Sequence, residues 1–417
     1  MWPPNCTNPV RNMAPLAGLW TPTGRGAIAT IRVSDVERFD ARGTGAVLDA
    51  VPFRAANGRP LSRQPIGRIV FGQWGTEPAE DVVLCAVDRQ SLEIHCHGGR
   101  AAAERILRDL AGAGFQVVDW SDMLAGEKSP LHAELIGQLY RATTMRTSTI
   151  LWEQANGVFE SSIAALRSSA TSNLAAASAR IREWLTWTDF GVHLTQPWCV
   201  VLAGRPNVGK SSLINAILGY TRSLVFDQPG TTRDVVHAST AVDGWPVELA
   251  DTAGLRDSAS PLESAGIERA RETLAAADLP MILIDMNQAA SPTDRALISQ
   301  YPRALVVAHK SDLPAYGGHG QWDTYESSAW HRVSSKTGEG LETLVAAVSH
   351  RLVSQVPPAD LLIPVTERQA SLLKCALDAS QQGDAVGVLR VLDELVGPSS
   401  KVDHSPSANR KGSPPTS

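Results

Sequence analysis

A phosphate-binding loop is the clearest chemical motif of this sequence. Residues 204–211 read GRPNVGKS and match GxxxxGK[ST], a pattern whose glycines let successive backbone N–H groups face a phosphate. An apolar run at 199–203 predicts the strand before the loop, and residues 212–218 predict the helix after it. In this setting Lys210 neutralises β- and γ-phosphate oxygens, and the Ser211 hydroxyl binds Mg²⁺. Average residue usage gives a chance match in only about 1% of sequences, so we expect a nucleotide site here.

Two switch-like motifs follow at suitable distances. Residues 230–234 read GTTRD and offer a threonine of the kind that closes over a γ-phosphate. Residues 251–254 read DTAG and match DxxG after a predicted strand at 247–249. There Asp251 would hold Mg²⁺ through water, and the Gly254 N–H would sense the γ-phosphate.

Two further motifs are of the kind that reads a base. The first, HKSD at 309–312, follows a predicted strand at 304–308 and resembles the guanine-reading motif NKxD. Its Asp312 can accept both N1–H and N2–H of guanine, which adenine does not offer. The second, VSSKTG at 333–338, looks like the SAK loop that brings a backbone N–H to guanine O6. Five motifs in this order predict a GTPase domain. The predicted nucleotide-binding residues are Gly204, Asn207, Val208, Gly209, Lys210, Ser211, Ser212, Asp251, Gly254, His309, Lys310, Asp312, Ser334, Ser335 and Lys336.

Two groups that complete hydrolysis in Ras-like GTPases are missing from these motifs. Leu255 follows DxxG at the position where Ras-like proteins carry the glutamine that orients the attacking water. The phosphate loop itself shows no evident arginine finger. Hydrolysis therefore needs another water-positioning group and another source of positive charge.

Length and composition indicate a soluble chain of several domains. The 417 residues (44.5 kDa) exceed one ordinary domain, and a net charge of −5 argues against a general polycationic nucleic-acid binder. Five scattered cysteines without a CxxC pair argue against a disulfide scaffold and favour a reducing cytoplasm. The apolar runs are far shorter than the roughly 20 residues of a spanning helix, and the N-terminus lacks a signal-peptide pattern. We therefore expect a cytoplasmic protein without a membrane segment.

The pattern of elements predicts a multi-domain chain of α+β and α/β class. Short alternating runs predict a small α+β domain, and helical periodicity recurs on both sides of the GTPase region. A GTPase domain of P-loop, Ras-like fold is therefore expected as an insertion in one helical domain. The predicted segments are a disordered extension (1–20), the N-terminal domain (21–118), the first half of the helical domain (119–195), the GTPase domain (196–356), the second half of the helical domain (357–396) and a disordered tail (397–417).

These motifs resemble those of the MnmE (TrmE) family of tRNA-modification GTPases, and the likeness runs from Thr21 to about Leu395. The insertion of the GTPase domain between helical segments is similar as well. In the GTPase region the likeness rests on Asn207, GTTRDV at 230–235, DTAGLR at 251–256 and ESAGIERA at 263–270. In the N-terminal, TrmE-like domain it rests on TPTGRG at 21–26, IRVS at 31–34, EDV at 80–82 and LEIHCHGG at 92–99.

The resemblance implies how hydrolysis is completed. A potassium ion would take the place of an arginine finger when two GTPase domains of a homodimer meet face to face. The implied Mg²⁺ ligands are Ser211, Thr232 and Asp251. Lys210, Thr232 and Glu263 would be the catalytic residues, with Glu263 positioning the attacking water through a bridging water. The implied potassium ligands are Asn207, Phe226, Gln228 and Thr231.

The resemblance also implies a set of partners. GTP would be the ligand, a tRNA wobble uridine the place of action, and an MnmG-like flavoprotein the protein partner. A tetrahydrofolate derivative would donate the one-carbon unit in the N-terminal domain.

The guanine motif departs from the family pattern. His309 stands where NKxD has asparagine, and an imidazole cannot reproduce both functions of the amide. We expect guanine to remain preferred through Asp312, with weaker affinity.

Two other stretches also depart from the family pattern. MnmE proteins end in Cys-x-Gly-Lys, whereas this sequence ends PPTS; its last cysteine, Cys375, is expected to be a small apolar residue on a helix face. The folate-associated stretch of the family has no clear counterpart at 120–131. His95, His97 and Arg25 are either remnants of a folate pocket or surface residues. A metal site from the two histidines is the weaker alternative, because no third ligand is apparent.

Three functions remain open at this point. The first is a potassium-stimulated GTPase that acts in tRNA wobble uridine modification. The second is a degenerate relative that keeps the GTP switch and acts as a regulatory or assembly protein. The missing terminal cysteine favours the second, and the domain layout favours the first. A ribosome-assembly GTPase of the Era or Der type is less favoured, because there is one phosphate loop and no KH-like appendage.

Overall fold

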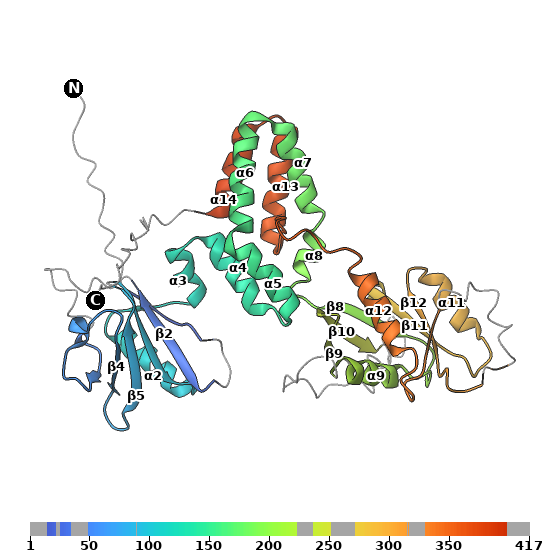
Figure 1. Ribbon diagram of the computed structural model, residues 1–417, viewed down its shortest axis with the longest axis horizontal. Coiled ribbons are helices and arrows are strands. Elements are labelled where there is room, and N and C mark those ends of the chain that lie inside the picture. Colours follow the sequence, from blue (N-terminus) through green and yellow to red (C-terminus); the bar gives the residue numbers. More distant parts are fainter. Residues whose placement is uncertain are drawn as a thin grey trace, which may run out of the picture. The chain divides into compact units, whose positions relative to one another are not determined.

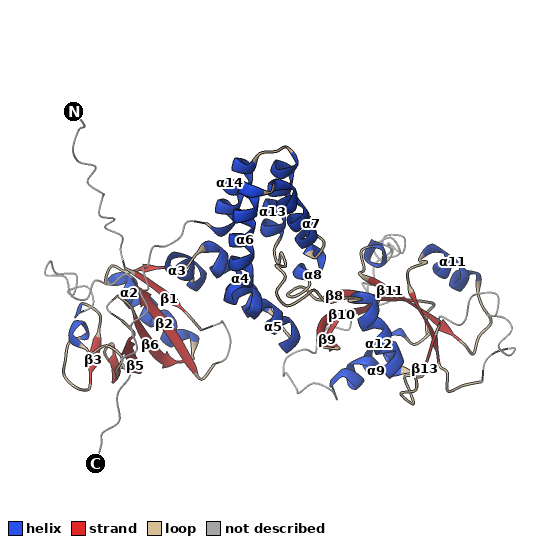
Figure 2. Cartoon of the chain, turned by 45° about the horizontal axis from the view of Figure 1, so that its top comes forward, coloured by secondary structure: helices blue, strands red, loops and turns tan. Residues whose placement is uncertain are grey.

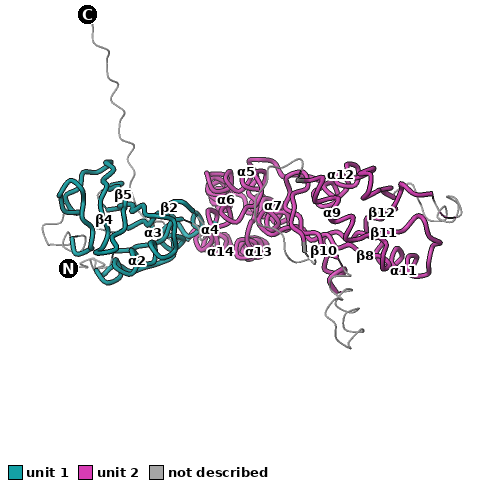
Figure 3. Tube along the Cα trace, turned by 90° about the horizontal axis from the view of Figure 1, so that it is seen from below, with its two compact units in different colours: residues 1–134, 397–417 teal, residues 135–396 magenta. Residues whose placement is uncertain are grey.

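The computed structural model divides the chain into two compact units, residues 1–134 with 397–417 and residues 135–396 (Figure 3). The first unit thus extends beyond residue 118, where the N-terminal domain was expected to end. Within the portion of the chain that the structure describes, no helix is long and apolar enough to cross a membrane. The described residues are 15–21, 26–34, 49–88, 90–222, 237–251, 272–314, 316 and 330–397.

The first unit is built on a seven-stranded sheet in the order β3-β4-β5-β6-β2-β1-β7. The paired neighbours are antiparallel except β1 and β7, which are parallel. Helix α2 (Arg100–Gly112) buries Ala103, Ile106 and Leu110, one face of a helix, against the core of this sheet. The strands are β1 (Leu16–Leu19), β2 (Ile28–Ser34), β3 (Phe53–Ala55), β4 (Ile69–Trp74), β5 (Glu80–Ala86), β6 (Leu92–His97) and β7 (Gln116–Val117).

Strand β1 corrects the prediction of a disordered extension over residues 1–20. It pairs with both β2 and β7, and its Ala17 is completely buried. A strand of four residues carries too little periodicity to be found from sequence, because its stability comes from its neighbours in the sheet. Residues 1–14 of the predicted extension and 398–417 of the predicted tail lie outside the described residues.

Helices from both sides of the GTPase region form one bundle in the second unit. Helix α13 packs against α7 and α14, and α14 packs against α6 (Figure 1). The GTPase domain is therefore inserted in a helical domain. The helices are α5 (Met145–Glu153), α6 (Phe159–Ser172), α7 (Leu174–Leu185), α8 (Thr188–Val192), α13 (Glu367–Gln381) and α14 (Ala385–Val396), after α3 (Trp120–Glu127) and α4 (Pro130–Arg141), which runs across the unit boundary.

The apolar spacing over 150–166 is helical, and the structure has two helices there with an interruption between them. A π-helical segment, η2 (Gln154–Val158), separates α5 from α6, and Gly157 adopts a φ of 119° there. The buried Gln154 amide donates to the Leu361 carbonyl (2.9 Å) and accepts from the Ile363 N–H (3.2 Å). The interruption thus coincides with the point where the returning chain is joined to the bundle.

The GTPase domain has a six-stranded sheet in the order β13-β12-β11-β8-β10-β9 (Figure 2). Its paired neighbours are parallel except β10 and β9, so most strands end at one edge. Helices α9 and α12 pack against each other, and α11 packs against β11. The elements are β8 (Trp198–Ala203), α9 (Lys210–Arg222), β9 (His237–Val242), β10 (Trp245–Asp251), β11 (Leu279–Asp285), α11 (Pro292–Gln300), β12 (Leu305–His309), β13 (His331–Val333) and α12 (Leu341–Leu352).

Two polar contacts join the GTPase domain to the helices within the second unit. The Arg146 guanidinium of α5 lies 2.8 Å from Asp243 Oδ2 and 4.1 Å from the centre of the Trp245 ring. His193 Nε2 lies 3.5 Å from Asp278 Oδ1, and its ring stacks on Trp198. Burial lowers the pKa of His193, but the Asp278 carboxylate and the Gln196 carbonyl outweigh it and raise the pKa overall.

Candidate nucleotide site

The phosphate loop lies between β8 and α9 and has an unusual backbone. Gly204 (φ 153°), Asn207 (φ 61°) and Gly209 (φ 103°) all have positive φ angles. A Cβ at Gly204 would lie 2.7 Å from the Leu283 carbonyl oxygen, and one at Gly209 would overlap the His309 ring. Glycine is therefore required twice, and the loop leads directly into the N-terminus of α9, where backbone N–H groups and the helix dipole attract anions.

The predicted magnesium residues of two motifs meet at this loop. Ser211 Oγ donates to Asp251 Oδ2 at 2.9 Å, and Lys210 Nζ lies 3.9 Å from Asp251 Oδ1. Lys210 Nζ also contacts the carbonyl oxygens of Gly204 (3.3 Å) and Arg205 (3.4 Å). Adjacent hydroxyl and carboxylate oxygens are donors that Mg²⁺ prefers, and the ion keeps several waters in such sites. The donor set therefore fits a nucleotide-bound Mg²⁺.

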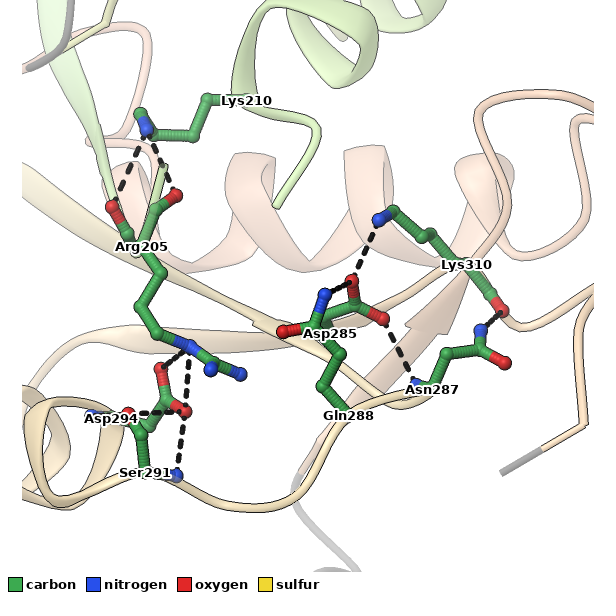
Figure 4. Close-up of polar contacts among 9 residues, drawn as sticks. Arg205, Lys210, Asp285, Asn287, Gln288, Ser291, Asp294 and Lys310 are labelled. Carbon is green, nitrogen blue, oxygen red and sulfur yellow. Dashed lines mark hydrogen bonds and ion pairs between the residues drawn. The ribbon is translucent and has the colours of Figure 1, made fainter. Parts of the chain in front are cut away.

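Arg205 of the phosphate loop is committed to a structural ion pair. Its Nε lies 3.1 Å from Asp294 Oδ2, and Asp294 is almost completely buried. Asp294 also forms a capping box with Ser291 at the start of α11. Figure 4 shows the Arg205 side chain running to this cap, whereas Lys210 lies on the other side of the loop. The ion pair therefore directs the Arg205 guanidinium toward the start of α11.

Lys310 joins the base-reading motif to the phosphate loop. Its Nζ lies 2.6 Å from Asp285 Oδ2 and 3.2 Å from the Asn207 carbonyl oxygen. The buried Asp285 carboxylate, at the end of β11, also accepts from the Asn287 N–H (2.9 Å) and the Gln288 side chain (3.2 Å), as Figure 4 shows. A buried charge is stable here because it is paired and hydrogen-bonded.

The Asp312 carboxylate is positioned by a hydrogen bond from Ser334. Ser334 Oγ donates to Asp312 Oδ1 at 2.7 Å, and this hydrogen bond lowers the pKa of the exposed carboxyl. The same buried Ser334 Oγ accepts from the backbone N–H groups of Lys336 and Thr337, both at 3.2 Å. The two predicted base-reading loops are therefore fixed to each other.

His309 is buried, and both of its ring nitrogens contact the protein. Nδ1 lies 2.8 Å from the Val208 carbonyl oxygen, and Nε2 lies 2.7 Å from Ser335 Oγ. The sequence motif predicts a base-contacting residue at this position, and the structure places it between the phosphate loop and the loop after β13.

The structure brings most predicted site residues to one edge of the sheet. They lie at or after the ends of β8, β10, β12 and β13 and are Gly204, Asn207, Val208, Gly209, Lys210, Ser211, Ser212, Asp251, His309, Lys310, Asp312, Ser334, Ser335 and Lys336. Predicted residues that lie outside the described residues are Phe226, Gln228, Thr231, Thr232, Gly254 and Glu263. Sequence reasoning missed Asp285 and Asp294. The capping pattern Ser-x-x-Asp at 291–294 was the available signal for the second.

The remaining candidates lie elsewhere. His95 Nδ1 contacts Thr30 Oγ1 at 3.0 Å, and His97 Nδ1 contacts Glu80 Oε1 at 2.5 Å. No group of three side chains suited to a metal ion occurs among the described residues, and Arg25 lies outside them. Cys375 was expected to be a small apolar residue on a helix face; it lies in α13, and its side chain is exposed.

The fold and this site define a P-loop GTPase. A phosphate loop follows the strand at which the sheet order reverses, and a Lys-x-Asp loop lies two strands away. In agreement, the model of the 50S ribosome-binding GTPase family matches residues 199–310.

Comparison of whole chains is more specific. The tRNA modification GTPase MnmE of Synechococcus sp. strain WH7803 is 31% identical in an alignment of 400 positions that covers 85% of this chain and 84% of the relative. The MnmE of Symbiobacterium thermophilum is 30% identical in an alignment of 427 positions that covers 91% of each chain. That of Synechococcus sp. strain RCC307 is 32% identical in an alignment of 440 positions that covers 90% of this chain and 92% of the relative. The protein therefore belongs to the MnmE family of tRNA modification GTPases, and it binds and hydrolyses GTP.

The two cations of the phosphate loop should respond differently to substitution. Arg205→Met should lower the free energy of unfolding by about 2 kcal/mol, because it leaves the buried Asp294 without its cation. GTP turnover at saturating nucleotide should stay within about threefold of the wild type, since a true arginine finger is worth about 10³-fold or more. Lys210→Met, as the contrast, should abolish GTP binding. Urea unfolding and phosphate release measure both effects; a 10³-fold loss of turnover without loss of stability in Arg205→Met would contradict the assignment.

Proposed function

We propose that this chain couples GTP hydrolysis to modification of the wobble uridine of tRNA. The observation that supports this most is the extent of the likeness to proteins named tRNA modification GTPase. Two of these relatives match over 84% and 91% of their own length, so the N-terminal and helical domains are shared together with the GTPase domain. A GTPase domain alone occurs with many functions and would not favour this one.

The phosphate site is completed by potassium in a pair of GTPase domains. By resemblance the Asn207 side chain is one ligand, and its backbone is fixed in the phosphate loop by a φ of 61° and by Lys310 Nζ, 3.2 Å from its carbonyl oxygen. Thr231 and the carbonyl oxygens of Phe226 and Gln228 complete the ligand set by resemblance. A potassium ion there would supply the positive charge that Arg205, tied to Asp294, does not supply.

Hydrolysis proceeds by in-line attack of water on the γ-phosphate. Lys210 neutralises the phosphate oxygens, and Ser211, Thr232 and Asp251 hold Mg²⁺. Glu263 orients the attacking water through a second water, in the role that glutamine has in Ras-like proteins.

The partners follow from the same resemblance. The chain acts as a homodimer with an MnmG-like flavoprotein in the cytoplasm. A tetrahydrofolate derivative is the one-carbon donor of this proposal, and the N-terminal domain is its binding place.

The potassium proposal predicts an ion-dependent rate. GTP turnover should be at least about tenfold faster in K⁺ than in Na⁺, because the smaller ion does not fit a site built for the larger one. Glu263→Ala should lower turnover in K⁺ by about 10²-fold or more and leave GTP affinity unchanged. Glu268→Ala, a glutamate of the same segment, is the matched control. Equal rates in both ions, or an unimpaired Glu263→Ala variant, would show that the mechanism is wrong.

The biological role is tested by mass spectrometry of tRNA nucleosides from a deletion strain. The wobble uridine modification should disappear, return with the wild-type gene, and fail to return with Lys210→Ala, because that variant cannot bind GTP. Unchanged nucleosides in a strain without a second homologue would contradict the proposal and favour the regulatory alternative.

A further inference from the structure

Two departures from the guanine motifs contact each other in this chain. His309 stands at the asparagine position of NKxD, and Ser335 stands at the alanine position of SAK. The structure places His309 Nε2 2.7 Å from Ser335 Oγ, and His309 Nδ1 2.8 Å from the Val208 carbonyl oxygen. The imidazole therefore links the phosphate loop, the end of β12 and the loop after β13.

The proton positions of this link follow from its partners. The Val208 carbonyl can only accept, so Nδ1 carries the ring proton. Burial lowers the pKa of His309, and Lys310 lowers it further, against the opposing effects of the Val208 carbonyl, Asp285 and Asp312. A neutral ring with Nδ1–H has a lone pair on Nε2, and Ser335 donates its hydroxyl proton to that lone pair.

This arrangement leaves His309 without a proton for the base. Guanine presents N7 and O6 as acceptors on the edge away from its Watson–Crick donors. An asparagine amide carries two protons and can divide them between the protein and the base, whereas His309 has one and gives it to Val208.

The neighbouring residues Ser334 and Ser335 contact different residues of the HKSD motif. Ser334 Oγ holds the Asp312 carboxylate at 2.7 Å, and Ser335 Oγ holds His309. By the likeness of residues 333–338 to the SAK loop, the Ser335 backbone N–H would be the donor to guanine O6. A side chain at Gly209 would overlap the His309 ring, so the phosphate loop is shaped to admit the ring.

We propose that His309 is a positioning residue that, through Ser335, fixes the base-reading loop to the phosphate loop, so that this chain recognises guanine through Asp312 and the Ser335 N–H and makes no contact with N7. This inference rests on the nucleotide site proposed above. The sequence motif predicts that His309 contacts the base directly. In this proposal His309 instead connects the two loops, which we call the His309 tie, and the serine at the alanine position of SAK, Ser335, makes this contact possible.

A double-mutant cycle tests the tie in the full-length protein with Mg²⁺ and fluorescent GDP. His309→Ala and Ser335→Ala should each weaken GDP binding by about fivefold. The double variant should also bind GDP about fivefold more weakly than the wild type, whereas independent effects would multiply to about 25-fold. Ser311→Ala is the matched control, because its hydroxyl contacts the exposed Glu339 at 3.4 Å and should combine additively with His309→Ala. Additive effects of His309→Ala and Ser335→Ala would overturn the tie.

A second probe, 7-deaza-GDP, lacks the N7 acceptor and separates positioning from direct reading. The wild type should bind it within about twofold of GDP, whereas the conservative variant His309→Asn should prefer GDP by about fivefold, because an amide regains a spare donor. A fivefold preference for GDP in the wild type that disappears in His309→Ala would show that His309 reads N7 and would overturn the proposal. Absence of GDP binding by the wild type would instead overturn the nucleotide site itself, and the tie with it.

Discussion

A loop that turns its backbone N–H groups toward a phosphate keeps its shape only if its carbonyl side is held by other groups. In this protein the carbonyl oxygens of Gly204 and Arg205 contact Lys210, that of Asn207 contacts Lys310, and that of Val208 contacts His309. These contacts stabilise a backbone with several positive φ angles, which would otherwise be strained at Asn207. The phosphate-binding geometry is thus a property of the surrounding strands as much as of the loop.

The parallel sheet supplies these contacts because its register brings distant residues to one edge. Asp285 at the end of β11 is the direct neighbour of His309 at the end of β12. The Asp285 carboxylate therefore holds Lys310, which reaches the phosphate loop, and Asp294 of the helix after β11 holds Arg205. Each of these two cations has a buried acidic partner that limits where its side chain can point.

Local sequence patterns predict the motifs but not these ties. The phosphate loop, the strands before DxxG and NKxD and the insertion of the GTPase domain follow from spacing and periodicity within short windows. The tie of His309 depends on Val208, which is 101 residues away, and on Ser335, which is 26 residues away. A pattern within a short window of sequence does not show contacts between residues so far apart in the chain. The sequence motif therefore predicts only that His309 contacts the guanine base.

Other features that the sequence did not reveal have the same physical origin. Strand β1 has four residues and is stabilised by pairing with β2 and β7, and the π-helical turn at 154–158 is held by residues more than two hundred positions later. Cysteine is a residue type that is often buried, but Cys375 is exposed. Its exposure depends on which face of α13 packs on α7 and α14. Tertiary contacts decide each of these features.

If these contacts hold the phosphate loop, it has its binding shape before nucleotide arrives, and crystal structures of the nucleotide-free and GDP-bound protein are the sharpest test. We expect Asn207 to keep a φ near about +60° in both. We also expect His309 Nδ1 to stay within about 3.2 Å of the Val208 carbonyl oxygen in both. A nucleotide-free loop in which Asn207 leaves the left-handed region, or a GDP complex in which the His309 ring has turned to the base, would contradict this view of the site.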